Sequence, residues 1–174
     1  MAEKVKLRDY QKSILDRLDV VRTDAASVAS SFLGVEIGGK NVLVDLLDIS
    51  ETLVVSDIQP VPLVQPWFLG MSNVRGVLYA INDLGQLLNN RFTEISSDTR
   101  ILLINNTISS NVGILADKLI GLRQLEMFTV KEDAEDSGIC FKSRVYEDEE
   151  KKVWYMLDCE KLISSKEFET PYAT

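Results

Sequence analysis

The chain has 174 residues, of which 45% are hydrophobic and 26% are charged, and its formal net charge is −8. This length suits one domain, or two small subdomains that share a core. An acidic surface repels phosphate backbones and anionic lipids, so we expect no nucleic-acid partner. No apolar run approaches the roughly 20 residues that cross a bilayer. We therefore expect a cytoplasmic protein without direct membrane insertion.

The sequence contains no histidine. This removes the commonest general base, the usual partner of a Ser or Cys nucleophile and the commonest metal ligand. Two carboxylate groups, Asp45 with Asp48 and Glu132-Asp133 with Glu135-Asp136, match no catalytic or calcium-binding motif, and the Gly38-Gly39-Lys40 stretch matches no phosphate-binding motif. We expect no enzymatic activity, no catalytic residue, no metal and no cofactor. Cys140 and Cys159 are interpreted as free thiols, with a disulfide as the alternative.

The first segment predicts a helix. Apolar residues recur every three or four positions between Leu7 and Val28, with charged residues on the opposite face. We assign residues 1–30 to an N-terminal helical extension. It would either pack on its own domain or contact a partner.

From Phe32 the pattern changes to short β-like runs. Strands are predicted over residues 32–37, 41–47, 51–58 and 76–82, with a hairpin turn at Gly38-Gly39-Lys40. Residues 67–72 suggest a helical turn. Residues 83–89 suggest a short helix with Asp83 as its N-cap.

The second half follows a polar connector at residues 90–99. Strands are predicted over residues 100–105, 111–121 and 122–128, and a hairpin over residues 140–158 with a charged turn. A helical turn closes the domain at residues 159–163, and residues 165–174 form a tail. Many short strands with frequent turns favour a barrel or sandwich. We expect a domain over residues 31–164, divided into subdomains at about 31–90 and 100–164.

One arginine stands in a hydrophobic setting. Arg75 lies in PWFLGMSNVRGVLYAINDLGQLL (residues 66–88), which is otherwise uncharged until Asp83. Its guanidinium must reach water, an internal partner such as Asp45, Asp83 or a turn carbonyl, or an external partner. Gly76 would permit a sharp turn beside it. The residues alone favour the internal and the external partner equally.

The same stretch resembles the motif of CheW-like domains, the coupling proteins of bacterial chemosensory arrays. The matching residues are Pro66, Trp67, Gly70, Asn73, Val74, Arg75, Gly76, Asp83 and Leu84. The stretches VGILADKLIGLRQL and VWYMLDCEKLI resemble later family strands, so the similarity covers about residues 32–163. The family's proline before Asp-Leu is absent, and Ala116-Asp117 replaces its Val-Asp. The N-terminal extension is similar to that of coupling proteins from type IV pilus (twitching) systems.

The resemblance implies a mainly β fold of two packed five-stranded β-barrels. It implies a non-catalytic adaptor between a chemoreceptor's cytoplasmic hairpin tip and the regulatory domain of a CheA-type histidine kinase, recruited to membrane-associated arrays, with ring assembly of CheW-like domains as a further expectation. The residues implied for receptor coupling are Arg75, Asn73, Val74, Gly76, Val42 and Val44. Those implied for kinase binding are Leu115, Asp117 and Leu119.

A second class of function stays open from the residues alone. A small-ligand or oligonucleotide-binding β-barrel would also have short strands. It would be distinguished by a basic, aromatic face or by a conspicuous pocket.

Overall fold

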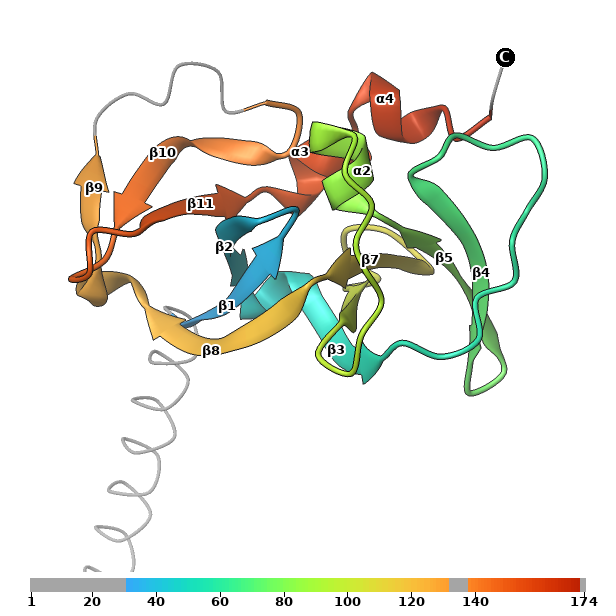
Figure 1. Cartoon of the computed structure of the whole chain (residues 1–174), viewed down its shortest axis with the longest axis horizontal. Helices are drawn as coiled ribbons and strands as arrows, with labels where there is room; N and C mark the ends of the chain where they lie inside the picture. The colour runs from blue at the N-terminus through green and yellow to red at the C-terminus, as the bar shows by residue number, and fades with distance from the viewer. Residues whose placement is uncertain (1–30, 132–137, 173–174) are drawn as a thin grey trace, which may run out of the picture.

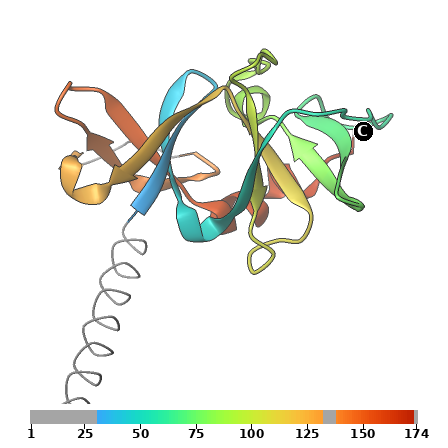
Figure 2. The ribbon, with the colours of Figure 1, turned by 90° about the horizontal axis from the view of Figure 1, so that it is seen from below.

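The computed structural model describes residues 31–131 and 138–172 (Figure 1). The predicted N-terminal helix lies outside these residues. The described chain is mainly β, as expected, and its strands form two sheets. Seen from below, the sheets curl into two neighbouring barrel-like bodies (Figure 2).

The larger sheet has six strands in the order β8-β1-β2-β11-β10-β9. All of its neighbours are antiparallel except β11 and β2, which run parallel. The predicted turn at Gly38-Gly39 joins β1 and β2, and both glycines have positive φ. The strand bounds are β1 Ser31–Ile37, β2 Lys40–Asp45, β8 Lys118–Gln124, β9 Thr129–Lys131, β10 Phe141–Glu147 and β11 Val153–Leu157.

The smaller sheet has five strands in the order β3-β6-β7-β5-β4. Here β5 and β7 are the parallel pair. The residues after β3 return along the free edge of β4, where Gln59 and Met71 exchange two backbone hydrogen bonds of 2.7 and 2.9 Å. The sheet thereby closes on itself. The strand bounds are β3 Ile49–Val54, β4 Phe68–Val74, β5 Val77–Asn82, β6 Arg100–Ile104 and β7 Val112–Ala116.

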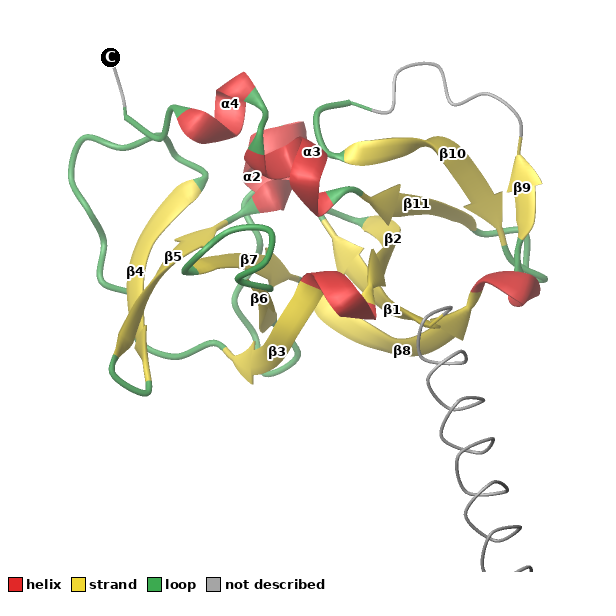
Figure 3. Cartoon of the chain, turned by 180° about the vertical axis from the view of Figure 1, so that it is seen from behind, coloured by secondary structure: helices red, strands yellow, loops and turns green. Residues whose placement is uncertain are grey.

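Short helices connect the sheets: α2 Leu84–Asn89, α3 Cys159–Ile163, α4 Lys166–Glu169 and the 3-10 turns η1 Leu46–Asp48 and η2 Leu125–Met127. The three α-helices gather on one side of the molecule (Figure 3). Asp83 is the predicted N-cap of α2, and its carboxylate accepts a bond from Gln86 N at 3.1 Å. The same buried carboxylate accepts bonds from the backbone N and the hydroxyl of Thr93. One carboxylate therefore fixes both the helix and the connector that follows it.

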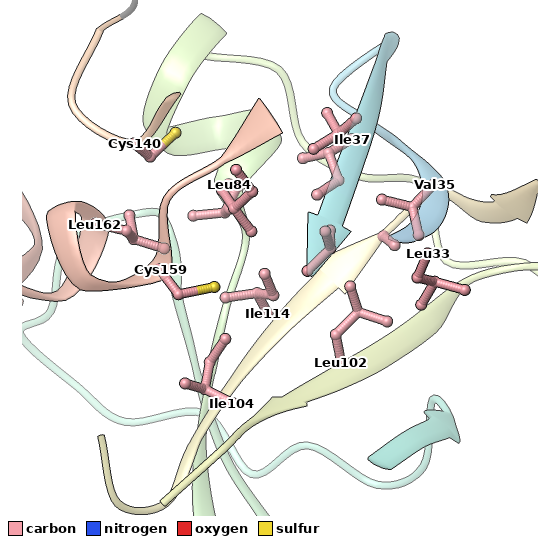
Figure 4. Packing of buried hydrophobic residues seen from close by; sticks show 14 of the residues in the cluster. Leu33, Val35, Ile37, Leu84, Leu102, Ile104, Ile114, Cys140, Cys159 and Leu162 are labelled. Atoms are coloured by element: carbon pink, nitrogen blue, oxygen red, sulfur yellow. The ribbon is translucent and has the colours of Figure 1, made fainter. Parts of the chain in front are cut away.

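The buried apolar side chains form three clusters. The six-stranded sheet encloses Phe32, Leu43, Tyr146, Trp154 and Met156. The five-stranded sheet encloses Ile81, Ile101, Leu103 and Leu115. The largest cluster lies between the sheets and receives side chains from both sheets and from α2 and α3 (Figure 4). Both faces of β1, β2, β6 and β7 are thus covered, which accounts for their nearly continuous hydrophobic sequences.

Cys140 and Cys159 are buried free thiols in the cluster between the sheets. This confirms the expected free state. Burial raises the pKa of Cys140 to about 12 and also raises the pKa of Cys159. Both thiols therefore behave as small apolar side chains, because the reactive thiolate is disfavoured.

The structure differs in detail from the expected elements at three places. Each of the two packed sheets takes strands from both halves of the chain, and one sheet has six strands where five were expected. Residues 68–74 form β4 and no helical turn, because backbone pairing with β5 prevails. Residues 166–172 form α4 and a β-bridge at Tyr172, and hence no free tail.

Candidate functional site

The corner between β4 and β5 presents Arg75. Val74 pairs with Val77, which leaves Arg75 and Gly76 as a two-residue hairpin loop. Both have positive φ, 51° and 88°, as a type I′ turn requires. A Cβ on Gly76 would meet nothing within 4 Å, so the turn conformation alone accounts for this glycine. Asn or Gly is the usual residue at the first position, and arginine there is locally unfavourable.

Asn73 stabilises this turn. Its side-chain oxygen accepts a hydrogen bond of 2.8 Å from the backbone N–H of Gly76. This is the local role that an Asn side chain often takes in turns. Asn73 therefore shapes the corner from which the neighbouring Arg75 side chain extends.

Arg75 has an internal partner that the sequence did not suggest. Its Nη1 and Nη2 donate to the two carboxylate oxygens of Glu51 on β3 at 2.9 and 2.6 Å. These bonds raise the pKa of Arg75 above its ordinary value. The bidentate geometry orients the planar guanidinium. Sequence gives no signal for this pair, because β3 and β4 lie at opposite ends of the strand order and meet only when the sheet curls.

The paired arginine remains open to solvent. Its side chain is 75% exposed and that of Glu51 is 34% exposed. Val77 and Leu78, which follow the turn, are also exposed. The corner thus combines a fixed cation, unused N–H donors and apolar side chains. Such a surface can bind a carboxylate or backbone carbonyls next to an apolar contact.

The other residues implied by the resemblance do not join this corner. Val42 and Val44 are fully buried between the sheets, and Leu115 is fully buried inside the five-stranded sheet. In this conformation none of the three can contact a partner, which corrects their assignment as contact residues. Their alternating strand pattern is explained by the core.

Asp117 and Leu119 lie at the start of the β8 edge. The Asp117 carboxylate accepts a weak bond of 3.4 Å from Gly39 N, and its backbone N donates to Glu36 O. Leu119 pairs with Val35 and is 37% exposed. These two residues belong to the segment of the six-stranded sheet, whereas Arg75 belongs to the five-stranded sheet. The structure therefore places Asp117 and Leu119 on a different sheet from Arg75.

A groove of about 650 Å³ opens on the six-stranded sheet. Its apolar floor includes Trp154 and Phe128. Most of its charged groups have partners within the chain: Lys118 pairs with Glu36, Lys152 pairs with Glu150, and Asp148 accepts a bond from Trp154 Nε1 at 2.8 Å. The Arg123 guanidinium lies over the Trp154 ring. This neutralised lining offers no basic, aromatic face for a phosphate backbone.

Comparison with known proteins gives the family. The model of the CheW-like domain matches residues 31–167. The chain belongs to the CheW-like domain family. This is a family of non-catalytic scaffold proteins. No helix within residues 31–131 and 138–172 is long and apolar enough to span a membrane.

Two individual proteins illustrate the relationship. The protein PilI of Pseudomonas aeruginosa is 26% identical over 102 residues, which cover 59% of this chain and 57% of PilI. The match thus spans little more than half of PilI. The crystal structure of the scaffolding protein TtCheW from Thermoanaerobacter tengcongensis has a TM-score of 0.66 at 15% identity, over 80% of this chain and 95% of TtCheW. That similarity shows the fold.

Proposed function

We propose that this CheW-like protein is a non-catalytic adaptor that couples a chemoreceptor to a CheA-type histidine kinase. Family membership supports a scaffold role. The observation that carries the receptor contact is the Arg75–Glu51 pair at an exposed corner. An arginine occupies a turn position that favours Asn or Gly, and the fold gains only an exposed ion pair from it.

The receptor contact would use the free side of this corner. The guanidinium has five N–H donors, and Glu51 takes two of them, so donors remain for a carboxylate or carbonyl on a receptor helix. Val74 and Gly76 contribute through the backbone of the turn, and Val77 and Leu78 supply the apolar contact. Asn73 acts by holding the turn.

The kinase contact is proposed on the six-stranded sheet. Leu119 and Asp117 at the β8 edge are its candidates, because both keep some exposure. Recruitment to membrane-associated arrays would follow from the receptor contact. Control of type IV pilus motility is proposed from the similarity to PilI over part of its length.

Calorimetric titration tests both contacts. The full chain is titrated with the regulatory domain of its genome's CheA-type kinase and, separately, with a receptor hairpin-tip peptide. The account predicts micromolar binding to both. Arg75→Asn suits the turn and should abolish only the receptor titration. Absence of both titrations for folded wild-type protein would refute the adaptor function and favour a ligand-binding barrel.

A further inference from the structure

The C-terminal segment clasps the loop that precedes β4. We call residues 59–67 and 166–172 the C-terminal clasp. Gln65 N donates to Pro171 O at 2.6 Å, and Gln65 Nε2 donates to Tyr172 O at 3.1 Å. Phe168 stacks on Trp67 with ring centroids 5.2 Å apart. In Figure 1 the two segments lie side by side at the end of the five-stranded sheet.

The clasp is stiff for a loop. All four prolines of the chain lie in it: Pro60, Pro62, Pro66 and Pro171. Each proline fixes its own φ and restricts the residue before it. The Trp67 carbonyl also accepts a bond of 2.7 Å from Asp83 N, which ties the clasp to the cap of α2. The loop conformation is therefore largely determined before any partner binds.

Leu63 occupies an unfavourable place at the apex of this loop. Pro62 and Leu63 are the central residues of a turn, and Leu63 has φ of 58°. Asn or Gly normally supplies a positive φ at the second central position. The Leu63 side chain is 82% exposed, so it contributes almost no burial in return. Nothing within the described fold explains a leucine here.

Other exposed apolar side chains extend the apex. Val61 belongs to the same loop, and Tyr172, which bridges to Val64, is 73% exposed. The nearby charges are mainly negative, because Glu167 and Glu169 stand against Lys166 in these two segments and Asp57 lies two residues before the first of them. The apex is therefore an apolar knob with an acidic margin.

We propose that Val61, Leu63 and Tyr172 form a preorganised docking knob for an apolar socket with a basic rim on a protein partner. Rigid apolar anchors are the residues that dominate interface energies, because little conformational entropy is lost when they bind. The acidic margin selects a socket bordered by Lys or Arg. The prolines and the clasp hold the backbone of Leu63 in its unfavourable conformation, so the leucine side chain extends in one fixed direction.

This inference rests on the proposed function and gives the kinase a second contact, at the end of the five-stranded sheet, in addition to the candidate contact at the β8 edge. The knob and the Arg75 corner lie at opposite ends of β4, whose seven residues run from Phe68 beside the clasp to Val74 beside the corner. At about 3.3 Å per residue the two ends of β4 are roughly 20 Å apart. One partner can occupy the knob while another occupies the corner.

The test compares two exposed apolar positions in the full chain. Leu63→Asn suits the positive φ, and Ile95→Asn is the matched control at a 57% exposed site in the 90–99 connector. Each protein is titrated with the kinase regulatory domain and with the receptor hairpin tip. We expect Leu63→Asn to weaken kinase binding about tenfold or more. Receptor binding and melting temperature should not fall, and Ile95→Asn should bind both partners normally.

The other outcomes are distinguishable. Wild-type protein that binds neither partner would refute the adaptor function itself. Normal kinase binding by Leu63→Asn would overturn the docking knob while leaving the adaptor function intact. A lowered melting temperature for Leu63→Asn would overturn the docking role and show that the leucine stabilises the fold. Loss of receptor binding alone would show that the knob contacts the receptor and not the kinase.

Discussion

Arg75 reaches from the β4–β5 turn to Glu51 on β3, and its two terminal nitrogens bond both oxygens of that carboxylate. The pair links the two strands that end the five-stranded order. It therefore offers both a structural role, closing the sheet, and a binding role, orienting the guanidinium.

Exchanging the two charges separates these roles. The double variant Arg75→Glu, Glu51→Arg again allows an ion pair, now with the carboxylate on the turn and the guanidinium on β3. We expect the double variant to regain the melting temperature lost by either single variant, but not receptor binding, because the cation no longer extends from the turn. Thermal unfolding and titration of all four proteins measure this cycle. Recovery of binding together with stability would assign a purely structural role to Arg75.

Removing the aromatic stack should loosen the clasp. Phe168→Ala takes away the ring that covers Trp67, which is only 7% exposed. We expect a loss of roughly 1–3 kcal/mol in the free energy of unfolding, since Phe168 is half-buried and its removal leaves a partial cavity. Trp67 fluorescence should shift to longer wavelength. Glu167→Ala, on the exposed side of the same helix, is the control and should change neither quantity.

Two glycines of the motif should differ sharply in tolerance. Gly70 has φ of 142°, and a Cβ there would overlap the Gln59 carbonyl oxygen that bonds Met71. We expect Gly70→Ala to cost more than about 3 kcal/mol or to prevent folding. The Cβ of Gly76→Ala would meet no atom within 4 Å, so we expect the free energy of unfolding to fall by only about 1 kcal/mol, because of the positive φ. Denaturant unfolding compares them, and equal losses would contradict the close approach at Gly70.

Asp48 should make stability depend on pH. Burial, with a further contribution from Asp45, raises its pKa above the ordinary value. The carboxyl therefore favours folding most when protonated, below the unfolded pKa of about 3.9, and this contribution is lost as pH rises through the folded pKa. Asp48→Asn should raise the free energy of unfolding at neutral pH and give no gain near pH 3. A pH-independent difference in denaturant unfolding would contradict this cause.

Local sequence patterns predicted most elements but not their partners. The Gly38-Gly39 turn, the Asp83 cap and the charged turn before β11 were correctly predicted, because each depends on neighbouring residues. The free state of the two cysteines was also correctly predicted, from the redox compartment expected for the chain. The assignment of strands from both halves of the chain to each sheet could not be predicted, since strands with similar alternating patterns do not reveal which strands they pair with. Glu51 was missed for the same reason.

The clasp shows a different limit of sequence reasoning. Residues 165–174 were predicted as a tail, and only the fold brings Phe168 onto Trp67. Val42, Val44 and Leu115 were assigned to surfaces through the family resemblance, although their strand pattern equally predicts core. The family resemblance and the strand pattern thus disagree for these three residues, and their full burial agrees with the strand pattern.

The most direct test of the adaptor function is a co-sedimentation measurement. Receptor hairpin tips are attached to vesicles, and the CheA-type kinase is added with wild-type protein, with Arg75→Asn, or alone. The account predicts that the kinase sediments with the vesicles only when wild-type protein is present. Kinase sedimentation that is the same in all three mixtures would contradict the coupling function.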